Sequence, residues 1–230
     1  MSKRKAKRKR VDVLVSGRGT NMEALIEAAS DKHFPAMINR VITNNPGAGA
    51  LEIAARNNIP SIVIDHRDHD DRQSHEEAIS KILDEDRPDV VCLAGYMRIL
   101  SPDFVRRYMG RIINIHPSLL PSFRGIDTHE RALSAGVRIH GASVHFVTEK
   151  LDEGPVIAQT AVPVLASDTA ETLGARVLEQ EHRLYPHALR LVSSGAVRMS
   201  GGRAVFDATV DEEDSANPAD GALFSPGIKE

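Results

Sequence analysis

Cysteine is almost absent from this chain, and long apolar runs are absent altogether. The one cysteine among the 230 residues, Cys92, excludes a disulfide within the monomer. It lies in the apolar run Val90–Leu93, where a small buried hydrophobic side chain is expected rather than a nucleophile. No apolar stretch reaches the length needed to cross a bilayer, and no apolar segment of signal-peptide type follows the N-terminal charges. We therefore expect no signal peptide, no membrane anchor and a cytoplasmic location.

The net charge of −3 is unevenly distributed. Seven of the 29 Lys and Arg residues lie between Lys3 and Arg10, so the rest of the chain has 22 basic against 32 acidic residues. An acidic body argues against binding nucleic acid through the fold. Residues 1–10 are interpreted as a basic, disordered tail, with contact to RNA or an anionic lipid as the alternative. Residues 208–230, rich in acidic residues, Gly, Pro, Ala and Ser, predict a flexible C-terminal tail, which leaves residues 11–207 as one domain.

Short β-branched runs alternate with helical patterns through the first half of that domain. The predicted strands are 11–15, 40–43, 61–64 and 89–93, and the predicted helices are 22–29, 50–57, 74–83 and 101–108. Such alternation predicts an α/β fold with a parallel sheet and helices on both faces. After Pro117 the pattern changes to a strand pair, 141–148 and 155–164, then a long helix from 169 to 192 and a hairpin of 197–199 with 204–206. The sheet is therefore expected to be mixed but mostly parallel.

Asn114 and His116 stand two residues apart in a β-branched run that ends at Pro117. Strand side chains repeat every two residues, so both polar groups project from one face. An amide donor beside an imidazole suits stabilisation of an oxyanion in acyl-group transfer, and the alternative is a polar pair that caps a strand end. The turn Ser118–Pro121 favours the first interpretation, because it would hold both side chains at the carboxyl edge of a sheet, where open parallel sheets bind ligands.

Residues 16–21, Ser-Gly-Arg-Gly-Thr-Asn, follow the first predicted strand and open the first helix. Glycines and free N–H groups at a helix start suit a phosphate, although a plain tight turn is the alternative. The loop is neither the dinucleotide fingerprint, which needs a third glycine, nor a Walker loop.

Two further histidine positions leave alternatives open. His66 and His69 have the spacing of metal ligands, but their polar surroundings favour a solvated loop. His145 alternates with Ser143 on a predicted strand, so it faces the site or packs in the core.

Several longer motifs occur together and in order. They are Ser16–Asn21, Ala94–Pro102, Asn114–Pro121, His140–Val147, Leu151–Ile157 and Gln180–His182. In sequence and spacing the chain resembles the phosphoribosylglycinamide formyltransferases, folate-dependent enzymes of purine synthesis, over about residues 11–207. The resemblance implies a Rossmann-like formyltransferase domain that moves a formyl group from 10-formyltetrahydrofolate to the amine of glycinamide ribonucleotide. It implies no metal.

By the same resemblance the catalytic residues are Asn114, His116 and Asp152. Amine attack on the formyl carbon makes a tetrahedral intermediate, whose negative oxygen Asn114 and a protonated His116 would stabilise. Asp152 would hold His116 in its charged form and pass protons through water. Without the motif, Asp152 is more simply a turn residue.

The resemblance also implies two sets of substrate-binding residues. The phosphate and ribose of the ribonucleotide would lie on Gly19, Thr20, Asn21 and Glu181. The folate would lie on Arg72, Met97, Arg98, Ile99, Leu100, Val105 and Asn114. The alternatives are a solvated helix residue for Glu181 and surface positions for Arg72 and Arg98.

Two departures from the commonest family pattern keep other activities in view. Arg18 stands where an asparagine is frequent, and residues 122–125, Ser-Phe-Arg-Gly, are similar to the related methionyl-tRNA formyltransferases. Those enzymes need a second domain that binds nucleic acid, which the acidic segment after Phe206 does not suit. Formyltetrahydrofolate deformylase, a hydrolase, and a nucleotide-binding module with an inactive site are the remaining alternatives. The oligomeric state is expected to be monomer or homodimer.

Overall fold

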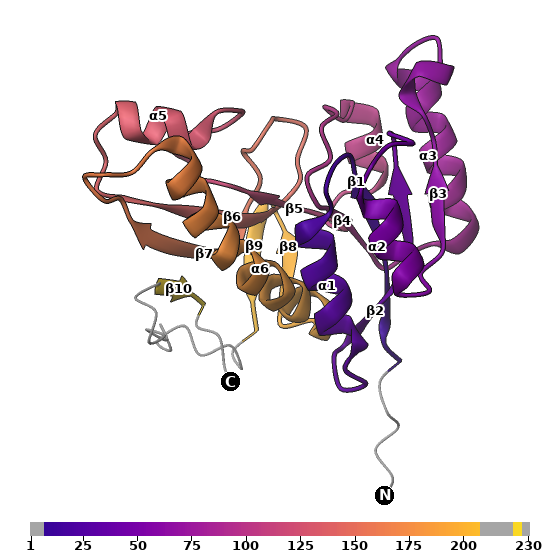
Figure 1. The fold of residues 1–230 in the computed structure, drawn as a ribbon. Helices are drawn as coiled ribbons and strands as arrows, with labels where there is room; N and C mark the ends of the chain where they lie inside the picture. Colours follow the sequence, from indigo (N-terminus) through magenta and orange to yellow (C-terminus); the bar gives the residue numbers. More distant parts are fainter. Residues whose placement is uncertain (1–6, 208–222, 227–230) are drawn as a thin grey trace, which may run out of the picture.

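The computed structural model describes residues 7–207 and 223–226. Its strands form one eight-stranded sheet and a separate two-stranded hairpin. Helices flank the large sheet (Figure 1). The strand order is β10-β7-β6-β5-β4-β1-β2-β3. The strands are β1 Lys9–Val15, β2 Ala36–Thr43, β3 Ser61–Val63, β4 Val90–Leu93, β5 Ile112–His116, β6 Ile139–Phe146, β7 Val156–Pro163 and β10 Leu223–Ser225. The first five are parallel to one another, whereas β6, β7 and β10 are antiparallel to their neighbours. This is the expected mixed, mostly parallel sheet.

Helices cover both faces of the sheet, as the alternation predicted. One face carries α1 Thr20–Ser30, α2 Ala50–Arg56, α5 Thr128–Ser134 and α6 Ala170–Ser194. The other carries α3 Arg72–Asp86 and α4 Pro102–Arg107. The hairpin of β8 Val197–Ser200 and β9 Arg203–Phe206 follows α6, and a 3-10 turn, η1, spans His66–Asp68. Within the described ranges, no helix combines the length and the apolar character that a membrane crossing needs.

The alternation of side chains along β1 shows why both faces need helices. Val13 and Val15 belong to the core beneath α1 and α6, whereas Leu14, between them, belongs to the core beneath α3 and α4. A strand buried on both faces reads as a continuous apolar run rather than as an alternating one. The first predicted strand therefore has apolar side chains on both faces, and its one polar residue, the buried Asp12, accepts a hydrogen bond from Asn39 at 2.7 Å.

The helix ends follow the local signals in the sequence. Ser101 caps α4 by accepting a hydrogen bond from the Phe104 amide at 3.2 Å, and Pro102 fills the first helical position. At α6, Thr169 and Thr172 form a reciprocal capping box, and Gly195 ends the helix in the left-handed conformation with φ 82°.

The strand order reverses direction between β1 and β4, which are neighbours in the sheet although two strands separate them in the chain. Ligands of open α/β sheets bind outside the carboxyl ends of strands at such a reversal. The loops that follow β1 and β4 are the phosphate-type loop from Ser16 and the motif from Ala94. The topology therefore brings two of the sequence motifs to one edge of the sheet.

The predicted N-terminal tail extends too far into the chain. Strand β1 begins at Lys9, not at residue 11, because Lys9 donates its amide to the carbonyl of Pro35 at 2.8 Å and forms an ion pair with Asp89 at 2.9 Å. Arg10 donates to the Asn39 side chain and to the Asp86 carbonyl. Residues 1–6 lie outside the described residues.

The predicted C-terminal tail also needs correction. Residues 223–225 form β10, which pairs antiparallel with β7, and Phe224 is fully buried. Residues 208–222 and 227–230 lie outside the described residues.

The structure further adds α5, for which no helix was predicted, and begins β2 at Ala36 rather than at residue 40.

Candidate active site

Strand β5 holds Asn114 and His116 on one face, as the two-residue spacing predicted. Their neighbours Ile113 and Ile115 point into the core beneath α6. Across the antiparallel pairing with β6, Asn114 lies opposite His145, and His116 lies opposite Ser143. Cross-strand partners share a face of the sheet, so His145 joins the polar pair.

Asp152 reaches this cluster from the connection between β6 and β7. The carboxylate oxygen Oδ2 lies 3.5 Å from Nδ1 of His116, and Oδ1 lies 3.7 Å from Nε2 of His145. The Gly125 amide donates to Oδ2 at 2.9 Å. The structure thus gathers the three predicted catalytic side chains, with His145 lying between Asn114 and Asp152.

The turn that carries Asp152 is shaped by its backbone. Asp152 itself has φ 52°, in the left-handed region that an aspartate tolerates better than most residues. Two residues later, a Cβ built on Gly154 would lie 1.6 Å from the carbonyl oxygen of Phe146. Only glycine can let the connection approach β6 this closely, so Gly154 sets the position from which Asp152 reaches the histidines.

His145 has a defined tautomer, because one of its nitrogens faces a group that can only accept. Nδ1 lies 3.0 Å from the Phe146 carbonyl, so it must carry the proton. Nε2 of the neutral ring then accepts from Nδ2 of Asn114 at 3.2 Å. Burial lowers the pKa of His145 to about 4, which keeps the ring neutral near pH 7. His145 therefore orients the side-chain amide of Asn114. The second N–H of that amide points away from His145 and can donate to a ligand.

His116 has acceptors at both nitrogens. Nε2 lies 3.0 Å from the Phe123 carbonyl, and Nδ1 faces Asp152. These two contacts hold the imidazole ring in one orientation beside Asn114.

Gly19 shapes the loop after β1. Gly19 precedes α1 with φ 82°, and a Cβ there would lie 2.8 Å from the Cβ of Ala50, the first residue of α2. Glycine therefore lets the loop pack against α2 while the N-terminus of the eleven-residue helix α1 stays directed at the edge of the sheet.

Two of the predicted ribonucleotide residues contact each other across 160 positions of sequence. Nδ2 of Asn21, in the first turn of α1, donates to Oε2 of Glu181 on α6 at 2.7 Å. Burial raises the pKa of Glu181 to about 7, and the hydrogen bond from Asn21 offsets only part of that shift. Glu181 is therefore not the solvated helix residue that the sequence left open.

The predicted folate residues divide by exposure. Met97 and Ile99 are 74% and 65% exposed, which is unusual for large apolar side chains and is typical of a binding surface. Val105 is 1% exposed, so little of its side chain is open to a ligand in this structure. Arg72 begins α3 and lines a cleft of about 540 Å³ between α3 and α4, where Gln73, Ser101 and Arg107 are among its neighbours.

Sequence reasoning did not find the residues that hold the loop after His116. Ser143 Oγ donates to the Ser118 carbonyl at 2.7 Å and accepts from the Leu120 amide at 3.0 Å. Gln159 Nε2 donates to the same Oγ at 2.8 Å. The available signal was the alternation of Ser143 with His145 on β6. In the other histidine pattern, the rings of His66 and His69 both pack against the ring of His75, and His66 also contacts Asn44. In the described part of the chain no group of three or more His, Cys, Asp or Glu side chains is placed to hold a metal ion.

Comparison with known proteins agrees with the topology of the sheet. The formyl transferase family model matches residues 9–189, which defines the class of protein as a formyl transferase. The chain is 43% identical over 195 residues to phosphoribosylglycinamide formyltransferase of Escherichia coli, with 85% of this chain and 92% of that protein covered. The crystal structure of phosphoribosylglycinamide formyltransferase from Brucella melitensis is 54% identical and superimposes with a TM-score of 0.79, with 82% of this chain and 97% of that one covered. The chain belongs to the phosphoribosylglycinamide formyltransferase family.

Longer proteins also contain a related segment. The trifunctional purine biosynthetic protein adenosine-3 of Gallus gallus is 50% identical over 190 residues, which are 83% of this chain and 19% of that protein. The chain thus spans about a fifth of the length of that relative, and the rest of that protein lies outside the matched segment.

Proposed function

We propose that this protein transfers the formyl group of 10-formyltetrahydrofolate to the primary amine of glycinamide ribonucleotide, a step of purine biosynthesis. One observation carries the proposal: Asn114, His145, Asp152 and His116 form a continuous polar cluster at the carboxyl end of β5. The loop of residues 16–21 offers a surface that suits a phosphate. The segment of residues 97–100, with its exposed apolar side chains, offers a surface that suits a pterin. Family membership supports both substrates.

The chemistry follows from the side chains. The amine nitrogen attacks the formyl carbon, and the carbonyl oxygen becomes an oxyanion. The second N–H of Asn114 donates to this oxygen, and the positive charge of His116 stabilises it at short range. His116 acts through its charge, because both of its nitrogens face protein acceptors in this structure.

Collapse of the intermediate completes the transfer. The bond from the formyl carbon to N10 of the folate breaks, N10 takes up a proton, and the amine loses one. Asp152 lies where it can exchange these protons through water, because its two oxygens face His116 and His145. The products are tetrahydrofolate and the formylated ribonucleotide.

The test compares three acceptors. The protein is given 10-formyltetrahydrofolate with glycinamide ribonucleotide, with initiator methionyl-tRNA, or with water alone, and release of tetrahydrofolate is followed. Turnover with the ribonucleotide only supports the proposal. Equal turnover without an acceptor identifies a deformylase, and turnover only with the tRNA identifies a methionyl-tRNA formyltransferase. Either result refutes the proposal.

A further inference from the structure

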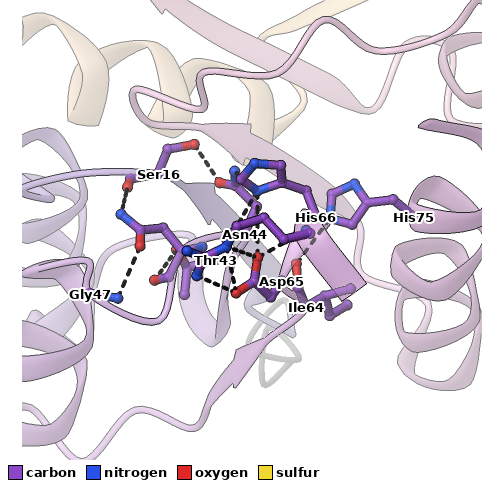
Figure 2. A network of polar contacts seen from close by, with 10 residues as sticks. Ser16, Thr43, Asn44, Gly47, Ile64, Asp65, His66 and His75 are labelled. Carbon is purple, nitrogen blue, oxygen red and sulfur yellow. Dashed lines mark hydrogen bonds and ion pairs between the residues drawn. The ribbon is translucent and has the colours of Figure 1, made fainter. Parts of the chain in front are cut away.

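A second polar cluster lies at the same edge of the sheet but contains none of the catalytic side chains (Figure 2). It joins the segments that follow four parallel strands: Ser16 after β1, Asn44 after β2, His66 after β3 and Met97 after β4. No motif in the sequence pointed to Asn44 or His66 as a partner of the β1 loop. At the centre of the cluster, the contact between Ser16 and Asn44 is buried.

Ser16 uses all of its polar groups to connect three loops. Its amide donates to the Gly95 carbonyl at 3.1 Å, and its carbonyl accepts from the Asn45 side chain at 3.3 Å. Its hydroxyl accepts from the Met97 amide at 2.8 Å and donates to Oδ1 of Asn44 at 2.6 Å. A buried serine with every donor and acceptor paired has one stable rotamer, so it fixes the distance between its partners.

Asn44 is the next member of the chain of hydrogen bonds. Its Oδ1 takes the single proton of the Ser16 hydroxyl, which leaves the serine lone pairs to face Met97. Its Nδ2 and its own carbonyl both approach Nδ1 of His66, at 3.2 and 3.0 Å. Figure 2 shows Asn44 between Ser16 and His66. Asn44 thus holds the serine hydroxyl in the direction that the Met97 amide requires.

The Met97 amide is one of two anchors of the exposed segment 97–100. The other anchor is Glu76 of α3, whose carboxylate accepts from the Ser101 amide at 2.7 Å and from the Ser101 hydroxyl. Between the anchors the segment forms neither helix nor strand, and it carries the exposed side chains of Met97 and Ile99. Leu100 packs against the core beneath α3 and α4, and the hydrogen bonds at the two anchors fix the position of the segment relative to the β1 loop.

We propose that Ser16, held by Asn44, is a positioning residue that sets the formyl-donor segment 97–100 against the ribonucleotide loop 17–21. This inference rests on the proposed function, because it assumes that these two loops hold the two substrates. The bridge aligns the formyl carbon with the attacking amine. Small misplacements of reacting groups weaken binding and lower the rate still more, because bond formation is more sensitive to geometry than binding is.

The experiment uses paired variants of the full chain. Ser16→Ala and Asn44→Leu remove the bridge, whereas Ser16→Thr keeps the hydroxyl and Asn44→Asp keeps an acceptor oxygen for it. Ser193→Ala is the matched control, because Ser193 is buried as Ser16 is and its hydroxyl has no partner among the described residues. Steady-state kinetics give kcat and KM for each substrate, and calorimetric titrations with tetrahydrofolate and with glycinamide ribonucleotide give the affinities.

We expect kcat to fall by about tenfold to a hundredfold in Ser16→Ala and Asn44→Leu. Tetrahydrofolate binding should weaken, and ribonucleotide binding should change by less than about threefold, since the phosphate contacts remain. At least one of the two conservative variants should restore kcat to within about threefold, and the double variant should lose little more than the worse single one, because both act through the same bridge.

Other outcomes overturn the proposal. Folded Ser16→Ala with kcat within about twofold of wild type shows that the bridge does not position the substrates. A kcat loss in Ser193→Ala equal to that in Ser16→Ala shows only a general effect of losing a buried hydroxyl. If the wild-type protein shows no turnover, the proposed function fails, and the bridge is then judged on binding: unchanged tetrahydrofolate affinity in Ser16→Ala refutes it.

Discussion

Replacing Glu181 by glutamine is expected to stabilise the folded protein above pH 7 while weakening ribonucleotide binding. Glu181 is 5% exposed, and burial raises the pKa of its carboxyl from the usual 4.5 to about 7. Only the hydrogen bond from Asn21 opposes this shift. The chain therefore keeps an unfavourable charge inside the fold whenever Glu181 is ionised.

The pH dependence has a definite sign. Below about pH 4.5 the carboxyl is protonated in both the folded and the unfolded protein, so Glu181 does not lower the free energy of unfolding. Between 4.5 and about 7 the unfolded chain ionises first, so the free energy of unfolding falls. At about 1.4 kcal/mol for each pH unit, the loss reaches about 3 kcal/mol above pH 7. Glutamine has the same shape without the charge, and its oxygen can still accept from Asn21.

Urea unfolding at about pH 5 and about pH 8 measures the effect. Glu181→Gln should exceed wild type by up to about 3 kcal/mol at the higher pH and by much less at the lower one. Glu179→Gln, an exposed change on the same helix, should differ from wild type equally at both values. A stability difference for Glu181→Gln that does not depend on pH would show that the buried charge is not the cause. Calorimetric titration at about pH 8 should show weaker ribonucleotide binding, and unchanged affinity would remove Glu181 from the binding site.

Three further changes test the site and the corrected boundaries. Asp152→Asn keeps the size of the side chain but deletes its charge, so turnover should fall by at least about a hundredfold while ribonucleotide affinity changes little. Near-normal turnover would show that Asp152 is only a turn residue. Gly19→Val places a branched side chain in a left-handed position against α2, so ribonucleotide binding should weaken far more than folate binding, and equal losses in a folded variant would contradict the assignment. Deletion of residues 1–10 should lower the melting temperature relative to deletion of 1–6, because it removes the start of β1 and the ion pair of Lys9; equal melting temperatures would show that these contacts contribute nothing.

The sequence predicted the parts of the fold that depend on local periodicity. The apolar runs of β1 and β4, the capped start of α4 at Ser101 and the shared face of Asn114 and His116 all follow from spacing within a few residues. The seven-residue helix α5 and the three-residue strand β10 were missed. Each of them packs or pairs with an element that is distant in sequence: α5 packs on α6, and β10 pairs with β7.

The site shows the same limit. The family motifs named Asp152 and Glu181, but their contacts depend on pairings that are distant in sequence, such as Asn21 with Glu181 and Asn114 with His145. The role of His145 was left open between site and core, because alternation gives the face of a strand and not the residue opposite. Asn44 gave no signal at all. In the sequence, an asparagine after a strand looks like any other residue at a strand end. Its role becomes visible only when the structure shows which serine it contacts.

The close approach at Gly154 has a consequence for how this protein tolerates mutation. Asp152 reaches the two histidines only because the backbone two residues later touches strand β6, with no room there for even a methyl group. A substitution at Gly154 would therefore damage the reaction as deeply as loss of the carboxylate, although glycine has no functional group. A survey of natural variants that scored only polar side chains would pass over this position. Activity can therefore be lost through a substitution at a residue that contributes only by having no side chain.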